Sequence, residues 1–368
     1  MSSRADVFVV GGGPAGLAAA IAARKKGLSV VVADGAQFPI EKACGEGLMP
    51  ATLAALTRLG VQVSKEHGYA FHGIKFLDES LAAKGEFPQG AGLGIRRTVL
   101  HEHLVRAAER VGVRMLWNTP VSAIQHDCVQ AGGQSFQYRW LIGADGVQSR
   151  VAKWFGLDRL STSHRRFARQ QHFRIAPWSP FVEIYWAADS QAYVTPVASD
   201  EVCVVFMSRD RHARIPALLE IHPELNKRLL GAATSSVERG AIAGTRVLRR
   251  VAHGNVLLVG DASGIVDAIT GEGLRLGFEQ AFAAIEAIAQ HDVNSYNRTH
   301  PAISRRSMNM ARLLLSIDGR PMLRRRVMGA LSDKPELFQS LLSIHTAGSR
   351  WSDRLAAGAG LGLKLLFA

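Results

Sequence analysis

The sequence has few cysteines and no long apolar run. Its three cysteines, Cys44, Cys128 and Cys203, are widely spaced, which argues against a disulfide framework or a cysteine-based metal site and is typical of a reducing cytoplasm. No apolar run reaches the roughly 20 residues that span a bilayer. The nearest, residues 355–368, is short, rich in glycine and interrupted by Lys364. The N-terminus lacks a secretory signal pattern, so we expect a cytoplasmic protein without a metal site.

Nucleic-acid-binding motifs are also missing, although the chain is basic. Lysine and arginine total 44 against 31 aspartate and glutamate, a formal net charge of +13. Aromatic residues are not interleaved with the basic ones, so we expect no nucleic-acid partner. The charge is typical of a solvated basic surface. Two functional roles stay open, namely attraction of an anionic cofactor and peripheral contact with an anionic membrane.

What the chain does contain is a dinucleotide-binding pattern at its start. Residues 6–10 predict a buried strand, and the glycine run of residues 11–16 follows at once. Residues 17–26 predict a helix, and residues 29–33 predict a second strand that Asp34 closes. The order of strand, glycine turn, helix, strand and acid is that of a dinucleotide site.

Each part of this pattern has a physical role. Gly11 permits the tight turn, Gly13 lets a pyrophosphate approach the backbone, and Gly16 lets helix and strand pack closely. The helix N-terminus offers free N–H groups to the phosphates. We expect Asp34 to accept hydrogen bonds from ribose hydroxyls. The predicted contacts of this block are Gly11, Gly13, Pro14, Ala15, Gly16 and Asp34.

Two later blocks place an aspartate at the end of a predicted strand. These strands are residues 139–143 and 255–259, and a helix predicted to run to about Gln290 follows the second block. Alone, each aspartate is more typical of a helix N-cap than of a ligand contact. Open α/β sheets, however, bind ligands at the carboxyl ends of their strands. The predicted contacts are Asp145, Gly260, Asp261, Gly271, Glu272, Gly273 and Leu274.

On these residues the chain resembles the FAD-dependent aromatic hydroxylases typified by p-hydroxybenzoate hydroxylase, with their relatives the geranylgeranyl reductases and flavin-dependent halogenases. The matching blocks are residues 11–16, 143–149 and 260–274, and Arg97 resembles the family's arginine beside the flavin. The resemblance covers roughly residues 1–300. It implies non-covalent FAD, with NAD(P)H bound only transiently because no second dinucleotide fingerprint is present.

The resemblance also implies roles for individual residues. Asp261 contacts the ribityl and pyrophosphate region, and the Asp145 block is linked to both FAD and NAD(P)H. Residues 272–274 place N–H groups and a helix dipole near the flavin ring, where they stabilise negative charge. Val121 contacts the adenine through its backbone.

These patterns predict an α/β fold: a Rossmann-type FAD-binding domain with an inserted β-sheet substrate domain and a C-terminal helical region. Residues 181–186 and 201–206 predict strands of the insert, and residues 215–233 predict a helix. The helical region is interpreted as a cap, with an apolar surface for a lipophilic substrate as the alternative. Candidates for pocket or sheet core are Trp178, Tyr185, Trp186, Tyr193 and Phe206. The predicted domains are residues 1–70, 96–160 and 247–298 (FAD), 71–95 and 161–246 (substrate), and 299–368 (helical).

The segment of residues 42–50 bears on the branch of the superfamily. It is similar to the Cys-Gly-x-Gly block of geranylgeranyl reductases, which makes Cys44 a candidate to position substrate or donate a proton. The alternative is a small buried residue. Aromatic hydroxylases usually carry proline where this chain has Ala268, which argues against hydroxylation. The tryptophan motif of the halogenases is absent from the sequence.

Two reaction classes follow from the resemblance. Family size favours an NAD(P)H-using monooxygenase that acts on a lipophilic, aromatic small molecule. The alternative is a reductase of carbon–carbon double bonds in a lipophilic substrate, with Cys44 supplying the proton. A halogenase and a non-enzymatic flavin-binding protein rank behind both.

Overall fold

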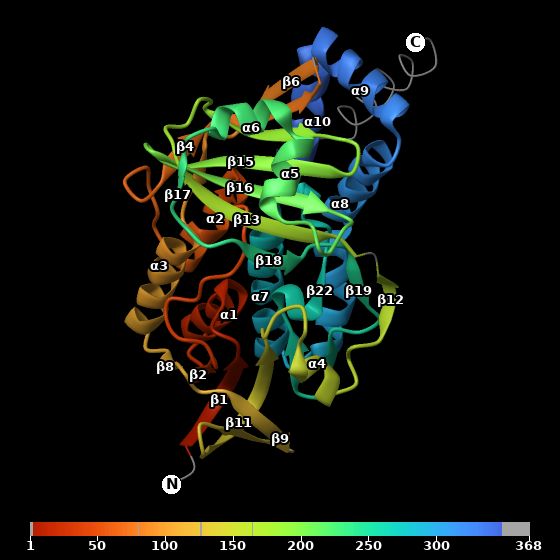
Figure 1. Cartoon of the computed structure of the whole chain (residues 1–368). Coiled ribbons are helices and arrows are strands. Elements are labelled where there is room, and N and C mark those ends of the chain that lie inside the picture. Colours follow the sequence, from red (N-terminus) through yellow and green to blue (C-terminus); the bar gives the residue numbers. More distant parts are fainter. Residues whose placement is uncertain (1–2, 80, 126, 164, 348–368) are drawn as a thin grey trace.

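The computed structural model describes residues 3–79, 81–125, 127–163 and 165–347. The apolar tail segment 355–368, and with it the end of the predicted helical region, lies outside the described residues. Figure 1 shows two sheet-containing parts, with β1, β2 and β11 at one end of the molecule and β13, β15 and β16 at the other. The C-terminal helices lie along one side of the second part.

The first sheet is the predicted nucleotide-binding sheet. Strand β1 (Ser3–Val10) lies at its centre, paired in parallel with β2 (Val30–Ala33) and β11 (Gln134–Gly143). The strand order is β20-β21-β11-β1-β2-β8. In addition, β10 pairs with β11, and β9 pairs with β10. Its other strands are β8 (Arg114–Leu116), β9 (Val121–Gln125), β10 (Cys128–Ala131), β20 (Ala252–His253) and β21 (Val256–Leu258).

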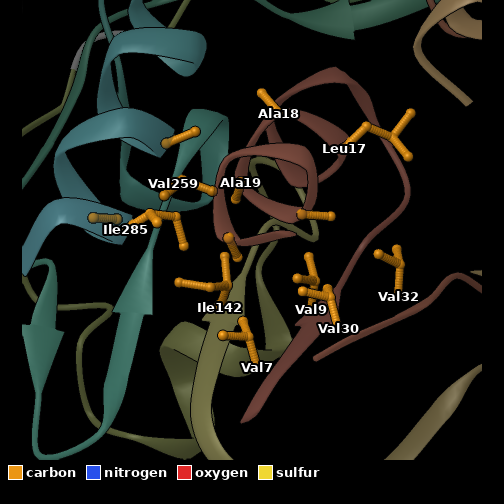
Figure 2. Close-up of a cluster of buried hydrophobic side chains, with 14 of the residues drawn as sticks. Val7, Val9, Leu17, Ala18, Ala19, Val30, Val32, Ile142, Val259 and Ile285 are labelled. Atoms are coloured by element: carbon orange, nitrogen blue, oxygen red, sulfur yellow. The ribbon is translucent and has the colours of Figure 1, made fainter. Parts of the chain in front are cut away.

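An apolar core lies against the parallel central strands of this sheet, β21, β11, β1 and β2. Figure 2 shows Val7, Val9 and Ile142 packed beneath Ala19 of α1. Helices cover these central strands, so β2 and β21 are buried along their whole length and do not alternate. The alanine-rich α1 has small side chains and can approach the sheet closely. The helices of this part are α1 (Pro14–Lys25), α2 (Pro50–Leu59), α3 (Arg97–Arg110), α4 (Arg150–Trp154) and α7 (Gly273–Ala289).

The inserted sheet has the order β17-β13-β16-β15-β14-β5-β6, with β18 beside β13. The predicted helix over residues 215–233 is wrong as a single element. It is divided into α5 (Ile215–Ile221) and α6 (Pro223–Leu229), because Pro223 has no N–H to continue the helix. The strands are β5 (Gly73–Asp78), β6 (Leu81–Glu86), β13 (Phe167–Arg174), β14 (Phe181–Trp186), β15 (Ser190–Ala198), β16 (Glu201–Ser208), β17 (Ala233–Thr234) and β18 (Arg239–Ile242).

Two small sheets lie between these parts. The first contains β3 (Gly47–Leu48), β4 (Tyr69–Phe71) and β7 (Gly92–Gly94). A Cβ on Gly94 would lie 1.7 Å from the Pro196 oxygen of β15, so glycine permits this sheet to touch the insert. The second contains β12 (Leu160–Ser163), β19 (Arg246–Leu248) and β22 (Gly264–Ile265), near the short 3₁₀ helices η1 (Gly260–Ser263) and η2 (Ala268–Thr270).

The C-terminal region consists of α8 (Val293–Asp318), α9 (Pro321–Asp333) and α10 (Pro335–Ala347). Helices α9 and α10 pack on the inserted sheet, where Met328 and Phe338 join a buried cluster with Phe76. The predicted α/β fold with an inserted sheet and a C-terminal helical region is confirmed. The domain boundaries stay a prediction, and the one at residue 298 falls inside α8. Within the described ranges, no helix has the length and apolar character to cross a membrane.

Candidate cofactor-binding site

Three glycine-containing blocks, far apart in the sequence, meet at the carboxyl ends of the central strands. Gly11 has a φ of +110°, and a Cβ there would lie 2.4 Å from the Ala144 oxygen. A Cβ on Gly260 would lie 2.7 Å from the Cβ of Ala15. Only glycine permits these approaches. The blocks that the sequence placed at separate strand ends therefore form one continuous surface.

Gly13 differs from its neighbours because its surroundings are open. No described atom lies within 4 Å of a Cβ placed on Gly13, whereas a Cβ on Gly16 would lie 2.0 Å from the Gly11 oxygen. Gly13 is also the N-cap of α1, and no side chain caps that helix. A helix N-terminus with free N–H groups and adjoining space is suited to an anion. The turn therefore fits a pyrophosphate at Gly13, with Gly16 serving the packing of helix against strand.

Asp34 holds the glycine turn from the side. Its Oδ2 accepts a hydrogen bond from Gly12 N at 2.7 Å, and its Oδ1 accepts one from Ala36 N at 2.8 Å. Each carboxylate oxygen can accept a second bond. Asp34 can thus keep the turn in place and still receive the ribose hydroxyls that the sequence predicts.

The next predicted contacts lie beside Asp34. Thr119 N donates to the Asp34 backbone oxygen at 2.8 Å, and Val121 follows two residues later. The Val121 oxygen accepts from Arg150 Nη1 at 3.2 Å. The Asp145 carboxylate accepts from Ser149 Oγ and from the Arg150 N–H group at the start of α4. Asp145 therefore acts as a helix cap in the described contacts, and its role toward a cofactor stays a prediction.

His101 is a residue of this site that the sequence did not reveal. Its Nε2 lies 2.7 Å from the Gly12 oxygen, and its Nδ1 accepts from Ile40 N at 3.2 Å. The accepting Nδ1 requires the hydrogen to be on Nε2, so the ring is neutral and donates to the glycine turn. Burial lowers the pKa of His101 and supports this state. Phe38 and Trp117 pack around the ring.

The far end of the surface is the N-terminus of α7. Gly271 has a φ of +66°, and the side chain of the following Glu272 bonds to Arg275 and to Ser307 of α8. These bonds engage the Glu272 carboxylate within the protein. A ligand at the N-terminus of α7 would therefore meet the backbone N–H groups of the helix. The predicted contacts here are Gly271, Glu272, Gly273 and the partly buried Leu274.

A loop crosses from this end toward the inserted sheet. Lys42 Nζ lies 3.3 Å from Oδ2 of the half-exposed Asp261. At the other end of the loop, the Met49 Cε would lie 3.8 Å from a Cβ on Gly271. Residues 42–49 therefore run beside the block of residues 260–274, and the reach of this segment to the cofactor stays a prediction.

The middle of this loop, residues 44–47, contacts the start of α3. Glu46 N donates to the sulfur of the half-buried Cys44 at 3.4 Å, and Glu46 Oε1 accepts from Arg97 N at 2.8 Å. Arg97 Nε is buried without a partner among the described residues. A buried, unsatisfied donor costs about 1–3 kcal/mol, so Arg97 is suited to a polar ligand. The open space at Gly13 and this unpartnered nitrogen together fit an extended dinucleotide.

The family comparison identifies that dinucleotide. Residues 4–293 match the model of the family described as FAD binding domain. The chain belongs to the FAD-binding domain family. It is an FAD-dependent oxidoreductase, and the resemblance to the FAD-dependent hydroxylases, reductases and halogenases is confirmed.

Individual members of the family are similar over most of the chain. Menaquinone reductase of Mycolicibacterium smegmatis is 28% identical over 340 residues, 82% of this chain and 81% of the relative. The chloroplastic geranylgeranyl diphosphate reductase of Oryza sativa subsp. japonica is 28% identical over 324 residues, 79% of this chain and 68% of the relative. A flavoprotein/dehydrogenase from Cytophaga hutchinsonii has the same fold, with a TM-score of 0.84, 19% identity, and coverage of 99% and 98% of the two chains.

The five aromatic candidates of the inserted sheet differ in their surroundings, and Trp178 lines a pocket together with Phe181 and Arg228. Tyr185, Trp186 and Phe206 are buried in apolar clusters. Trp178 Nε1 and the Tyr185 hydroxyl both donate to Glu183, at 2.7 Å and 2.6 Å. Tyr185, Trp186 and Phe206 therefore belong to the sheet core, whereas Trp178 and Tyr193 are half-buried.

Proposed function

We propose that this FAD-dependent oxidoreductase reduces carbon–carbon double bonds of a lipophilic isoprenoid substrate. The observation that carries the proposal is the loop of residues 44–47, in which Glu46 contacts both the half-buried Cys44 sulfur, through its backbone N–H, and the Arg97 N–H, through its carboxylate. Bound FAD, once reduced, supplies a hydride to one carbon of the double bond. The neighbouring carbon then needs a proton, and a positioned thiol such as that of Cys44 can provide it.

The names of the similar proteins support the same reaction class. Menaquinone and geranylgeranyl diphosphate both carry an isoprenoid chain, and the reducible groups of geranylgeranyl diphosphate are its double bonds. The common chemistry is an alkene within an isoprenoid chain. Relatives 28% identical over most of their lengths make this class the natural first hypothesis for the present chain.

The NAD(P)H-using monooxygenase favoured by family size is the second candidate. One contact weighs against it. Ala268 N donates to the Ala243 oxygen at 3.0 Å, and proline, which the aromatic hydroxylases usually carry here, has no N–H to make this bond. The loop before α7 therefore contains a backbone hydrogen bond that a proline at position 268 would prevent.

The experiment that separates the candidates is strictly anaerobic turnover. Enzyme with photochemically reduced FAD is mixed with menaquinone or geranylgeranyl diphosphate, and the mass of the product is measured by mass spectrometry. We expect a product that has gained two hydrogens in its isoprenoid chain and that, for menaquinone, keeps this gain after any quinol has been reoxidised. An absolute requirement for O₂, with ¹⁸O in the product, contradicts the proposal.

The thiol is tested separately from the substrate. Cys44→Ala should lower turnover by about 10²–10⁴-fold while the FAD content stays unchanged. Cys128→Ala is the matched control, because that half-buried thiol bonds to Ser135 on a different sheet edge. Equal turnover of wild type and Cys44→Ala removes the thiol from the mechanism.

We further propose NAD(P)H as the reductant of FAD. The family resemblance supports this assignment, and the site does not need a second nucleotide domain for a transient donor. Anaerobic mixing with NADH or NADPH should bleach the flavin absorbance within the turnover time. Flavin that stays oxidised with both nucleotides contradicts this part.

A lipophilic substrate suggests that the enzyme meets a membrane, and we propose peripheral contact through the corner of α8 and α9. Met322 is 84% exposed and Leu313 is 39% exposed at this corner. Basic side chains beside apolar ones favour an anionic lipid surface. The exposed arginines of the corner are Arg312, Arg320, Arg325 and Arg326.

A further inference from the structure

A buried carboxylate–imidazole pair joins the loop of residues 44–47 to the inserted sheet. Glu46 Oε2 lies 2.7 Å from Nε2 of His172 in β13, and the two residues are 5% and 2% exposed. Glu46 has a φ of +58°, a left-handed conformation that non-glycine residues rarely adopt. Such backbone conformations are concentrated at functional sites. The pair has no role in the proposed hydride and thiol chemistry.

The partners of His172 determine which ring nitrogen carries the proton. Ser236 Oγ accepts from His172 N at 3.0 Å and lies 2.8 Å from His172 Nδ1. The Ser236 hydroxyl can therefore donate its proton to Nδ1, which leaves the ring hydrogen on Nε2, facing Glu46. The Gln170 amide nitrogen is 3.1 Å and 3.0 Å from the two ring nitrogens. Being equally close to both, it lies over the ring face and at neither lone pair.

These groups form an unbroken chain from the interior to the surface. Ser236 is half-buried, and the adjacent Val237 is 65% exposed. At the inner end, Glu46 bonds to the backbone of Arg97, whose Nε is the unpartnered donor of the cofactor site. One carboxylate thus separates the predicted flavin-side arginine from a path to solvent.

Other titratable groups face the pair. Cys203 Sγ lies within 4.8 Å of the Glu46 and His172 ligand atoms. Burial raises the pKa of Cys203 well above its usual value, so this thiol stays protonated and provides neither a base nor a metal-binding thiolate. Arg96, the residue before α3, is engaged with Glu201 at 3.1 Å and with Glu41. Within this cluster, the Glu46–His172 pair is therefore where a proton can be transferred.

We infer that Ser236, His172 and Glu46 form a proton path that places one solvent proton on Glu46 when FAD in the site is reduced. Reduction adds negative charge near the loop, and like charge disfavours the ionised form of a buried carboxylate. The Ser236 hydroxyl proton moves to His172 Nδ1 while the Nε2 proton moves to Glu46 Oε2. Water then returns a proton to Ser236. No electrons move along the chain, and the net change is one proton taken from solvent.

The inference depends on FAD binding and not on the proposed substrate, so its test uses no substrate. Infrared difference spectra are recorded between the oxidised and the photochemically reduced FAD-loaded protein. We expect a protonated-carboxyl band to appear on reduction in the wild type and to be missing in Glu46→Gln. A spectrum without any such band, or with the band retained in Glu46→Gln, overturns the inference.

The path is tested with a milder change. Ser236→Ala removes one half-buried hydroxyl, and in time-resolved spectra the band should appear about 10²-fold more slowly than in the wild type. Ser235→Ala is the matched control, because that hydroxyl bonds to Glu201 and not to the ring. Equal rates in wild type and Ser236→Ala overturn the path, and this outcome can be read even where Glu46→Gln fails to fold.

Discussion

Replacing Gly13 by valine separates cofactor binding from folding at the glycine turn. No described atom lies within 4 Å of a Cβ at this position, and the backbone is extended, with a φ of −71° and a ψ of 175°. Valine can therefore be placed there without a clash in the apoprotein. Its side chain does, however, occupy the space at the N-terminus of α1 in which the pyrophosphate is expected.

The size of the effect follows from the hydrogen bonds that would be lost. A hydrogen bond to a charged group contributes about 1.5–3 kcal/mol. Loss of two such bonds from the N–H groups of α1 weakens FAD binding by about 3–6 kcal/mol, or about 10²–10⁴-fold in Kd. The apoprotein loses only the difference between glycine and valine at an N-cap, about 1 kcal/mol.

The assay is titration of apoprotein with FAD, followed by flavin fluorescence, alongside thermal unfolding of the apoprotein. Gly329→Val is the matched control, because a Cβ on Gly329 of α9 also meets no described atom within 4 Å. Gly16→Ala should instead lower the unfolding temperature, because its Cβ would lie 2.0 Å from the Gly11 oxygen. If Gly13→Val binds FAD within about threefold of the wild-type Kd, a difference below 1 kcal/mol, the pyrophosphate is not at this turn.

Three further perturbations test packing, titration and membrane contact. Arg166→Ala leaves the fully buried Asp267 without the guanidinium that lies 3.0 Å away; the free energy of unfolding should fall by about 3–5 kcal/mol in urea, and a loss below about 1 kcal/mol contradicts the ion pair's role. Burial lowers the pKa of His222 from 6.5 to about 4. As the pH falls, His222 is protonated in the unfolded chain before it is protonated in the folded protein. The free energy of unfolding that depends on His222 is therefore fully present above pH 6.5 and falls toward pH 4, by up to about 1.4 kcal/mol per pH unit. His222→Gln should flatten this decline, and an unchanged decline refutes the assignment. Met322→Glu should reduce sedimentation with anionic liposomes at low salt, whereas Leu230→Glu, at an 82% exposed position of the inserted part, should not; an equal effect of both, or no binding by the wild type, rejects the α8–α9 surface.

Local signals explain which parts of the fold could be predicted. The strand, turn, helix and strand at the start of the chain were predicted with the right order, because each depends on residues next to one another. The helix over residues 215–233 was wrong although its signal was local too. Pro223 divides this segment into α5 and α6. The spacing of apolar residues carries no information about the backbone N–H that proline lacks.

Contacts between distant residues explain what could not be predicted in the site. The convergence of the glycine blocks follows from a general rule for strand ends, so it was accessible. His101 meets Gly12 across 89 residues, and Glu46 meets His172 across 126 residues. Neither histidine stands in a motif, and only the folded chain brings them to the turn and the loop.

We expect FAD to bind along the glycine surface with its flavin ring at the loop of residues 44–47. A crystal structure of the FAD-loaded protein tests it most directly. The pyrophosphate oxygens should lie within about 3.2 Å of the N–H groups at Gly13 and the α1 N-terminus, with the flavin ring beside Arg97 and Cys44. A pyrophosphate bound elsewhere, or a ring on the far side of α7 from Cys44, contradicts it.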